Sequence, residues 1–546
     1  PDASGNPGVS ASRGVSSSPG VFSSPGVSAS PGVSSRPGIS ASPGVYAAHG
    51  VAARRGTAAI LVACLAYVAI SLAFFPQALG IRDELGFINQ AAVWSRGALS
   101  AEGAGLSDAA DFAEVGGRHV SWRNPGRSLL ILPFVGTGSL APHHVVSILV
   151  HLGITLLAVL YLRRERAPVG LALLVLFHPT LLLYSRTIMA DAPCGLLILG
   201  AALLLSRVHA AGPGLVSRSR ERLAAAGLLL GLAVVFRYQA GIVLLTLPAA
   251  MIFGRSSEGG HRPSRRWRDL ATVMGPGLLV VGLIMAYNQA QLGHVLGFLG
   301  QGAFSPSNIP IKLGAYLPAL LLLWPLMLLT PLLDRSSLAP AVRYSAVPFL
   351  VMLLFYSFHD YGTSRLETSV LCLRLLQPVL PLWILAYTVT AYRLLRTPLE
   401  SALASRPRTR RALALSLGAV TLVALAAGQT AMFRRHQAHL EELRAARQAV
   451  LASVPEGATI LADASVRKLF GSLLEEQPEY RWIDFETWPA SSSGDGNPPA
   501  FLAVLPKGGH VELRDRALGF ARERGMTRLA AGPSSLLLYQ PDRLPR

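Results

Sequence analysis

The sequence predicts an α-helical polytopic membrane protein with about eleven transmembrane helices and a small C-terminal α/β domain outside the membrane. Three observations support this fold class. First, 51% of the 546 residues are hydrophobic and only 14% are charged, whereas a soluble chain carries about a quarter charged residues. Second, arginines gather in short loops between long apolar segments, which is typical of membrane proteins. Third, the apolar segments shorten after Phe433, where strand-like and helix-like stretches begin to alternate.

Residues 1–53 are predicted to be a disordered tail. Glycines recur there every six residues from Gly8 to Gly50, mostly inside Ser-Pro-Gly-Val units. Hexapeptide repeats can form a β-helix, but the repeated prolines would remove hydrogen-bond donors from its ladders. No cleavable signal peptide is expected, because the first apolar segment lies far from residue 1.

The first predicted span, residues 57–79, is long enough for a bilayer, which requires about 20 residues. Arg54 and Arg55 precede this span and place the N-terminus in the cytoplasm. Residues 223–236 and 241–253 are short and are expected to be broken or strongly inclined helices. The further predicted spans are 141–162, 169–185, 192–205, 223–236, 241–253, 270–288, 313–333, 343–358, 371–395 and 412–431.

This topology divides the chain into three parts in the cytoplasmic (inner) membrane. The tail, residues 1–53, is cytoplasmic. Residues 54–432 form the membrane domain, in which residues 80–140 are the first external loop. Residues 433–546 form the extracytoplasmic domain, which shows no Gly-rich phosphate loop, no Ser-His-Asp spacing and no metal motif, so we expect it to be accessory.

Charge and cysteine usage exclude several classes of function. The net charge of +19 could suggest nucleic-acid binding, but the arginines occupy the loops of a membrane protein, so no nucleic-acid partner is expected. The three cysteines, Cys64, Cys194 and Cys372, lie in or beside apolar segments without C-x-x-C spacing, which argues against a zinc site or a disulfide framework. His143 and His144 are adjacent and cannot share one helix face, so a metal site there is not predicted.

Asp83 and Glu84 lie just beyond the first span. Carboxylates at a membrane face are costly to place, so they suggest function. The apolar spacing from Leu85 to Trp94 predicts a short helix that lies in the membrane interface and ends at Gly97. Since negative charge is favoured at a helix N-terminus, simple helix capping is an alternative of about equal weight for both carboxylates.

Several charged and polar residues lie near the predicted outer ends of later spans. Asp191 begins a span, where it could also be a helix cap. The arginines could extend toward lipid head groups, but cations outside oppose the positive-inside rule, which favours anion binding. These further candidates are Asp191, Arg186, Arg237, Tyr238, Lys312 and Arg374.

Five segments in this order resemble the GT-C membrane glycosyltransferases, in particular the protein-mannosyltransferase and lipid A aminoarabinose-transferase group. The resemblance covers residues 57–396, and no single motif in it is specific. The segments are RDELGFINQAAVWSRG, WRNPGRSLLILP, HPTLLLYSRTIMADAP, GLLLGLAVVFRYQ and LRLLQPVLPL. The sequence departs from the family pattern at Asn124, where a lysine is common, and at Leu375, where a tyrosine often follows the arginine.

The resemblance implies inverting transfer of a sugar from a polyprenyl-phosphate donor to a lipid, glycan or protein acceptor. Asp83 matches the general base, Glu84 would orient the acceptor or a bound ion, and Asp191 is the later outer acid. Cations would stabilise the leaving phosphate. The implied substrate-binding residues are Arg123, Arg186, Arg237, Tyr238, Lys312 and Arg374. The sequence names neither sugar nor acceptor, specifies no cofactor, and leaves a divalent metal ion open.

Two other functions remain open at this point. A secondary transporter is also polytopic, but such proteins usually show internal repeats and charges in the middle of spans, and the sequence shows neither. A non-catalytic membrane scaffold of envelope biogenesis is the second alternative. An Asp83 carboxylate directed into an outward cavity would favour the enzyme, whereas Asp83 capping a helix into water would favour the scaffold.

Overall fold

The computed structural model describes residues 43–101, 112–210, 216–253, 263–296, 305–323, 340–358, 373–402, 407–472, 480–485, 501–505, 511–529 and 536–541. The chain divides into two units, Pro1–Val51 and Ala52–Arg546. The predicted disordered tail lies almost wholly outside the described residues. The elements that follow Val51 all belong to the second unit.

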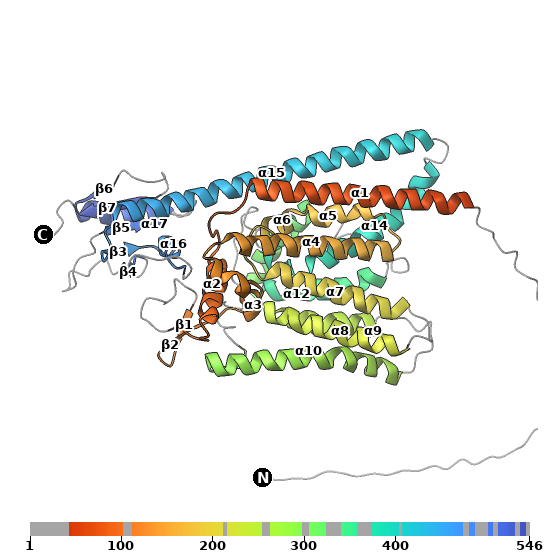
Figure 1. Ribbon diagram of the computed structural model, residues 1–546, viewed down its shortest axis with the longest axis horizontal. Coiled ribbons are helices and arrows are strands. Elements are labelled where there is room, and N and C mark those ends of the chain that lie inside the picture. The colour runs from red at the N-terminus through yellow and green to blue at the C-terminus, as the bar shows by residue number, and fades with distance from the viewer. Residues whose placement is uncertain are drawn as a thin grey trace, which may run out of the picture. The chain divides into compact units, whose positions relative to one another are not determined.

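Helices that pack side by side form the membrane part (Figure 1). Within the described residues, three helical segments are long and apolar enough to cross a membrane: Gly56–Ala73, Ala141–Arg164 and Arg266–Leu292. The chain is therefore a helical membrane protein, as predicted. The longer helices are α1 (Pro43–Ala73), α4 (Ala141–Arg164), α7 (Asp191–Ala210), α8 (Val216–Phe236), α9 (Ala240–Phe253), α10 (Pro263–Leu292), α11 (Asn308–Leu323), α12 (Pro340–Ser357), α14 (Leu380–Ala402) and α15 (Pro407–Ser453).

The structure places the broken span elsewhere than predicted. Residues 223–236 are not a broken helix, because they belong to α8, which begins at Val216 and continues for 21 residues. Residues 169–185 instead form three short pieces, η3 (Val169–Ala172), α5 (Leu173–Leu176) and α6 (Pro179–Tyr184). The break falls at His178, whose backbone is extended, since a residue before proline is disfavoured in helical conformation.

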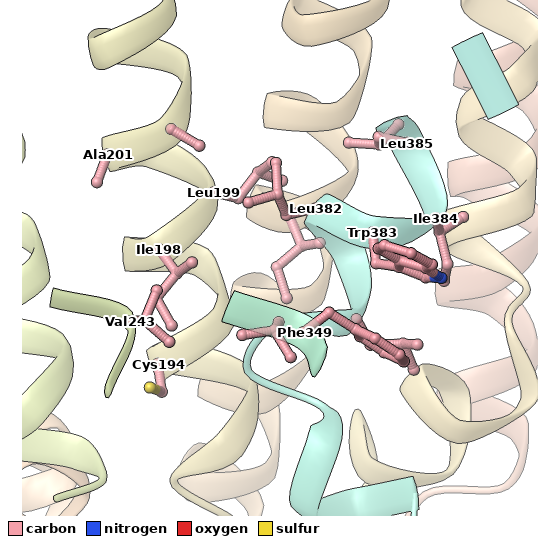
Figure 2. Packing of buried hydrophobic residues seen from close by; sticks show 14 of the residues in the cluster. Cys194, Ile198, Leu199, Ala201, Val243, Phe349, Leu382, Trp383, Ile384 and Leu385 are labelled. Atoms are coloured by element: carbon pink, nitrogen blue, oxygen red, sulfur yellow. The ribbon is translucent and has the colours of Figure 1, made fainter. Parts of the chain in front are cut away.

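Apolar side chains from α7, α9, α12 and α14 fill the core of the helical part (Figure 2). Phe349 of α12 stacks on Trp383 of α14, with ring centroids 4.5 Å apart and ring planes 11° apart. Cys194 and Ile198 of α7 lie fully buried beside Val243 of α9. Aromatic stacking of this kind adds to the burial of apolar area, so it holds α12 and α14 together.

Small residues bring α8 and α10 into close contact. Gly227 and Gly231 are four positions apart on α8, and both face α10. A Cβ atom on Gly227 would lie 1.8 Å from the carbonyl oxygen of Val273, and one on Gly231 would lie 2.8 Å from that of Gly277. Small residues at this spacing let transmembrane helices approach closely, so the α8–α10 contact depends on them.

The segment between α1 and α4, which the sequence predicts to be the first external loop, contains five short elements. They are α2 (Arg82–Ser95), β1 (Phe112–Val115), β2 (Arg118–Ser121), α3 (Pro125–Ile131) and η2 (Leu132–Thr137). The strands form an antiparallel hairpin that the sequence analysis did not predict. Its turn is Gly116–Gly117, with φ angles of 57° and 78°, as two-residue hairpin turns require. Residues 84–93 of α2 are all buried, so α2 is enclosed by protein on all sides over this stretch and does not present a separate apolar face to lipid.

The C-terminal part is an α/β domain, as predicted. Its sheet has the order β4-β3-β5-β7-β6, with β3 parallel to β4 and β5, and β7 antiparallel to β5 and β6. The C-terminal half of α15 covers one face together with α16, and α17 covers the other face. The elements are β3 (Thr459–Ala462), α16 (Ala464–Leu469), β4 (Arg481–Asp484), β5 (Phe501–Val504), α17 (Val511–Glu523), β6 (Met526–Arg528) and β7 (Leu537–Pro541).

Helix α15 joins the two parts. It runs for 47 residues, or about 70 Å at 1.5 Å per residue, and passes the expected domain boundary at residue 433 without a break. Its first part contains the predicted last span, residues 412–431. Its last turns pack on the sheet through Ala446 and Val450 (Figure 1). The C-terminal α/β domain is therefore joined to the membrane part by one continuous helix.

Candidate active site

The Asp83 carboxylate lies between two guanidinium groups. Asp83 Oδ1 is 2.8 Å from Arg123 Nη2, and Oδ2 is 2.9 Å from Arg374 Nη2. Asp83 belongs to the first turn of α2, Arg123 lies between β2 and α3, and Arg374 belongs to η5 (Leu373–Leu376). The three side chains keep 16%, 23% and 12% of their surface exposed, so the group is held by the fold yet remains accessible to a ligand.

Glu84, not Asp83, caps helix α2. Glu84 Oε2 accepts hydrogen bonds from the amides of Gly80 and Ile81, both at 2.8 Å, and Ile81 is the N-cap residue. Glu84 Oε1 accepts a third from the amide of Ile188, at 2.7 Å. Burial raises the pKa of Glu84 to about 7, while the three amide donors and the nearby Arg127 act in the opposite direction. The capping role is thus filled by Glu84, and the Asp83 carboxylate engages arginines.

Asp191 and Arg237 form a second ion pair. Asp191 begins α7, is fully buried, and has both carboxylate oxygens within reach of Arg237 Nη2, at 2.5 and 2.6 Å. Arg237 follows the last residue of α8. Arg374 is close enough to Arg237 for their charges to repel each other, and the charges of Arg237, Asp191 and Arg374 all act on the hydroxyl of the buried Tyr356 of α12. The Asp83 group and the Asp191–Arg237 ion pair therefore adjoin. Together their three arginines and two aspartates carry one net positive charge.

The other predicted site residues contact different elements. Arg186, which is 2% exposed, lies over the Phe433 ring at 4.3 Å and donates to Gln437 Oε1 of α15 at 3.2 Å. Tyr238 donates its hydroxyl to Asn288 of α10 at 2.9 Å. Lys312 is buried on α11. The structure thus brings together Asp83, Arg123, Arg374, Asp191 and Arg237, and it places Arg186 against α15.

A supporting network was missed from the sequence. Gln90 lies seven positions after Asp83 and so shares its helix face. Gln90 Nε2 donates to the Arg123 carbonyl at 3.1 Å, and Ser128 Oγ donates to Gln90 Oε1 at 2.6 Å. Helix α2 therefore holds both Asp83 and the backbone of its partner. The spacing of Gln90 on the helix was the available signal.

Asn124 occupies the position where the resemblance expects a lysine. Its Nδ2 donates to the Val234 carbonyl of α8 at 3.5 Å. The neighbouring Arg123 supplies the cation at Asp83 instead. Within the part of the chain that the structure describes, no group of three or more His, Cys, Asp or Glu side chains could hold a metal ion.

Comparison with known proteins identifies the fold. No family model matches the chain, and no curated protein matches it in sequence. The crystal structure of ArnT from Cupriavidus metallidurans in the apo state matches with a TM-score of 0.53 at 12% identity, over 88% of this chain and 98% of ArnT. ArnT bound to undecaprenyl phosphate matches with a TM-score of 0.50 at 13% identity and the same coverage. An Archaeoglobus fulgidus oligosaccharyltransferase matches with a TM-score of 0.41 at 12% identity, over 78% of this chain and 64% of that one. The chain therefore has the GT-C fold.

Proposed function

We propose that this protein is an inverting membrane glycosyltransferase that uses a sugar linked to polyprenyl phosphate. It transfers the sugar to a lipid, glycan or protein acceptor on the outer face of the cytoplasmic membrane. The observation that carries the proposal is the partly exposed Asp83 carboxylate between Arg123 and Arg374. The GT-C fold shared with ArnT, whose structure holds undecaprenyl phosphate, supports the choice of donor.

The five charged side chains suit a phosphate leaving group. Without substrate, Arg123 and Arg374 neutralise Asp83. A donor phosphate competes for the same guanidinium groups, because charge-assisted hydrogen bonds to phosphate oxygens are strong. Donor binding therefore draws the arginines away from Asp83 and leaves its carboxylate basic. Arg237, held by Asp191 beside Arg374, extends the cationic surface.

The reaction then needs one base and one set of cations. Asp83 takes the proton of the acceptor hydroxyl. The acceptor oxygen attacks the anomeric carbon from the side opposite the phosphate, and the bond between that carbon and the phosphate oxygen breaks. The bonding electrons leave with the polyprenyl phosphate, whose growing negative charge Arg123, Arg237 and Arg374 stabilise. The proton ends on Asp83, and the product has inverted configuration.

Mass spectrometry of cells with and without the gene tests the proposal. Deletion should remove one glycosylated lipid, glycan or glycoprotein and should increase the polyprenyl-phosphate sugar. The wild-type gene should restore the product, whereas a gene for Asp83→Asn should not. An unchanged set of glycosylated products would refute the proposal. If instead the uptake or export of a solute changed, the transporter alternative would be favoured.

A further inference from the structure

Glu84 connects the two acidic segments of the candidate site. We infer that Glu84 is a positioning residue. By accepting hydrogen bonds from backbone amides, it fixes the helix turn that carries Asp83 relative to the segment that precedes Asp191, and it does not touch substrate. The inference rests on the proposed function for its effect on transfer. It changes the role expected for Glu84 from the sequence, which was to orient an acceptor or an ion.

The oxygens of Glu84 are already occupied. Oε2 binds the amides of Gly80 and Ile81, and Oε1 binds the amide of Ile188. A carboxylate has about four lone-pair positions, and Glu84 is only 1% exposed. Because Ile188 lies three residues before Asp191, one buried carboxylate fixes the backbone beside both acidic residues.

The peptide unit between Thr187 and Ile188 is held from both sides. Its N–H group donates to Glu84 Oε1. Its carbonyl oxygen accepts from Ser147 Oγ at 2.7 Å, and Ser147 in turn accepts from the fully buried Arg127 at 2.5 Å. Glu84 of α2 and Ser147 of α4 therefore both form hydrogen bonds with the same peptide unit. A peptide held in this way cannot shift relative to α2 without losing a buried hydrogen bond.

Helix α15 packs against both segments that Glu84 connects, and we call the hydrogen bonds of Glu84 to these two segments the Glu84 joint. A Cβ atom on Gly80 would lie 3.0 Å from Leu440 Cδ2 and 3.3 Å from His436 Nε2, so the Glu84-bound Gly80 lies directly against α15. On the other segment, Arg186 reaches Gln437 of α15. Helix α15 thus contacts both segments that Glu84 joins. Because α15 continues into the C-terminal α/β domain, the position of this domain and the geometry of the Glu84 joint depend on each other.

The Glu84→Gln variant disrupts this joint with little change in volume. One oxygen becomes an NH₂ group, which must face at least one of the three amide donors. A displacement of about 1 Å between reacting groups can cost about 100-fold in rate. Since Glu84 would touch neither substrate, we expect kcat to fall about 10- to 100-fold with both KM values unchanged.

Hydrogen–deuterium exchange of the purified full-length protein tests the joint without requiring activity. In Glu84→Gln, peptides that contain Gly80, Ile81 and Ile188 should exchange faster, whereas Asp83→Asn should leave these amides unchanged. Asp463→Asn is the matched control, because Asp463 is also buried and accepts from three amides, those of Ser465, Val466 and Leu505, in the outer domain. This control should leave kcat within about twofold.

The outcomes separate the possible roles. Faster exchange in both segments together with a lower kcat and unchanged KM values supports the inference. Faster exchange with an unchanged kcat would mean that Glu84 has a structural role only. A raised acceptor KM would mean that Glu84 binds the substrate, and unchanged exchange would mean that Glu84 does not hold the two segments together. Each of these three results overturns the inference. If Glu84→Gln does not fold, Ser147→Ala loosens the same peptide from its other side and should give a smaller effect of the same kind. Absence of transfer by the wild-type protein would refute the proposed function and leave exchange to decide the joint.

Discussion

Asp83 and Arg374 are 291 positions apart in the chain yet form a direct ion pair. Each was a candidate from the sequence, because a carboxylate or an arginine at the outer end of a span is unusual. Their pairing could not be predicted, since it depends on how α2 and η5 pack. The sequence also left open which of the two carboxylates caps α2, because adjacent carboxylates at a helix start fit that role equally well.

Replacement of Arg374 by alanine should weaken use of the donor more than use of the acceptor. Arg374 would bind the phosphate, which only the donor carries, so we expect the donor KM to rise about tenfold, the loss of one charge-assisted hydrogen bond. Steady-state kinetics of the purified variant with each substrate varied in turn would measure this. Arg393→Ala is the control, because Arg393 pairs with Glu165 at a more exposed site. Equal changes in both KM values would mean that Arg374 only supports structure.

At the scale of elements, the sequence predicts most helices but not how they are enclosed. Long apolar segments and flanking arginines were sufficient to predict the membrane spans that lie in α4 and α10. The hairpin of β1 and β2 was missed, although Gly116–Gly117 between two short stretches is a hairpin signal. The burial of α2 could not be predicted, because residues far away in sequence, such as Gly471, which accepts from Asn89, cover it.

Replacement of Gly227 by valine should weaken the packing of α8 against α10. The added atoms would overlap the Val273 carbonyl, and overpacking typically costs about 1–3 kcal/mol. The midpoint of thermal unfolding in detergent should therefore fall by several degrees. Gly282→Val on α10 is the control, because a Cβ at Gly282 meets nothing within 4 Å. A variant at Gly227 as stable as this control would contradict the close contact.

His436 should make the junction of α15 with the Gly80 segment sensitive to acid. Burial, aided by the Arg186 charge, lowers the pKa of His436 to about 3 from the ordinary 6.5. Between these values the unfolded chain binds a proton that the folded chain does not, so stability falls as pH falls through this window. Unfolding midpoints at about pH 7.5 and about pH 5 should differ less in His436→Gln than in the wild type. His439→Gln, at an exposed position, should behave as the wild type; an equal effect of both would assign the sensitivity elsewhere.

At the scale of the whole molecule, composition was sufficient to predict a helical membrane protein with an outer α/β domain. The alternation of strands and helices after residue 453 predicted the sheet, since β3 and β5 are short and apolar. The continuity of α15 was not predicted, because its apolar part, residues 412–431, and the polar helical stretch that follows were assigned to different domains. The GT-C fold became certain only from the arrangement in space, at 12% identity to ArnT.

The predicted orientation can be tested by chemical labelling. In a chain whose native cysteines are replaced, a cysteine at the exposed Glu523 of α17 should react with a membrane-impermeant maleimide in right-side-out vesicles. A cysteine at the exposed Ser264, in the basic first turn of α10, should react only after the vesicles are opened. The arginine distribution motivates both expectations. Labelling of Ser264→Cys in sealed vesicles, or protection of Glu523→Cys, would invert or invalidate the topology.

Transfer by purified Asp83→Asn tests the central claim most directly. Asparagine keeps the size of the side chain and can still accept a hydrogen bond from an arginine, but it cannot take a proton from the acceptor. General-base catalysis contributes about 10²- to 10⁴-fold, so single-turnover transfer from a polyprenyl-phosphate sugar should fall by that factor. Asp515→Asn, at an exposed position of α17, should transfer at the wild-type rate. Near-normal transfer by folded Asp83→Asn, under conditions limited by chemistry, would contradict the assignment of Asp83 as the base.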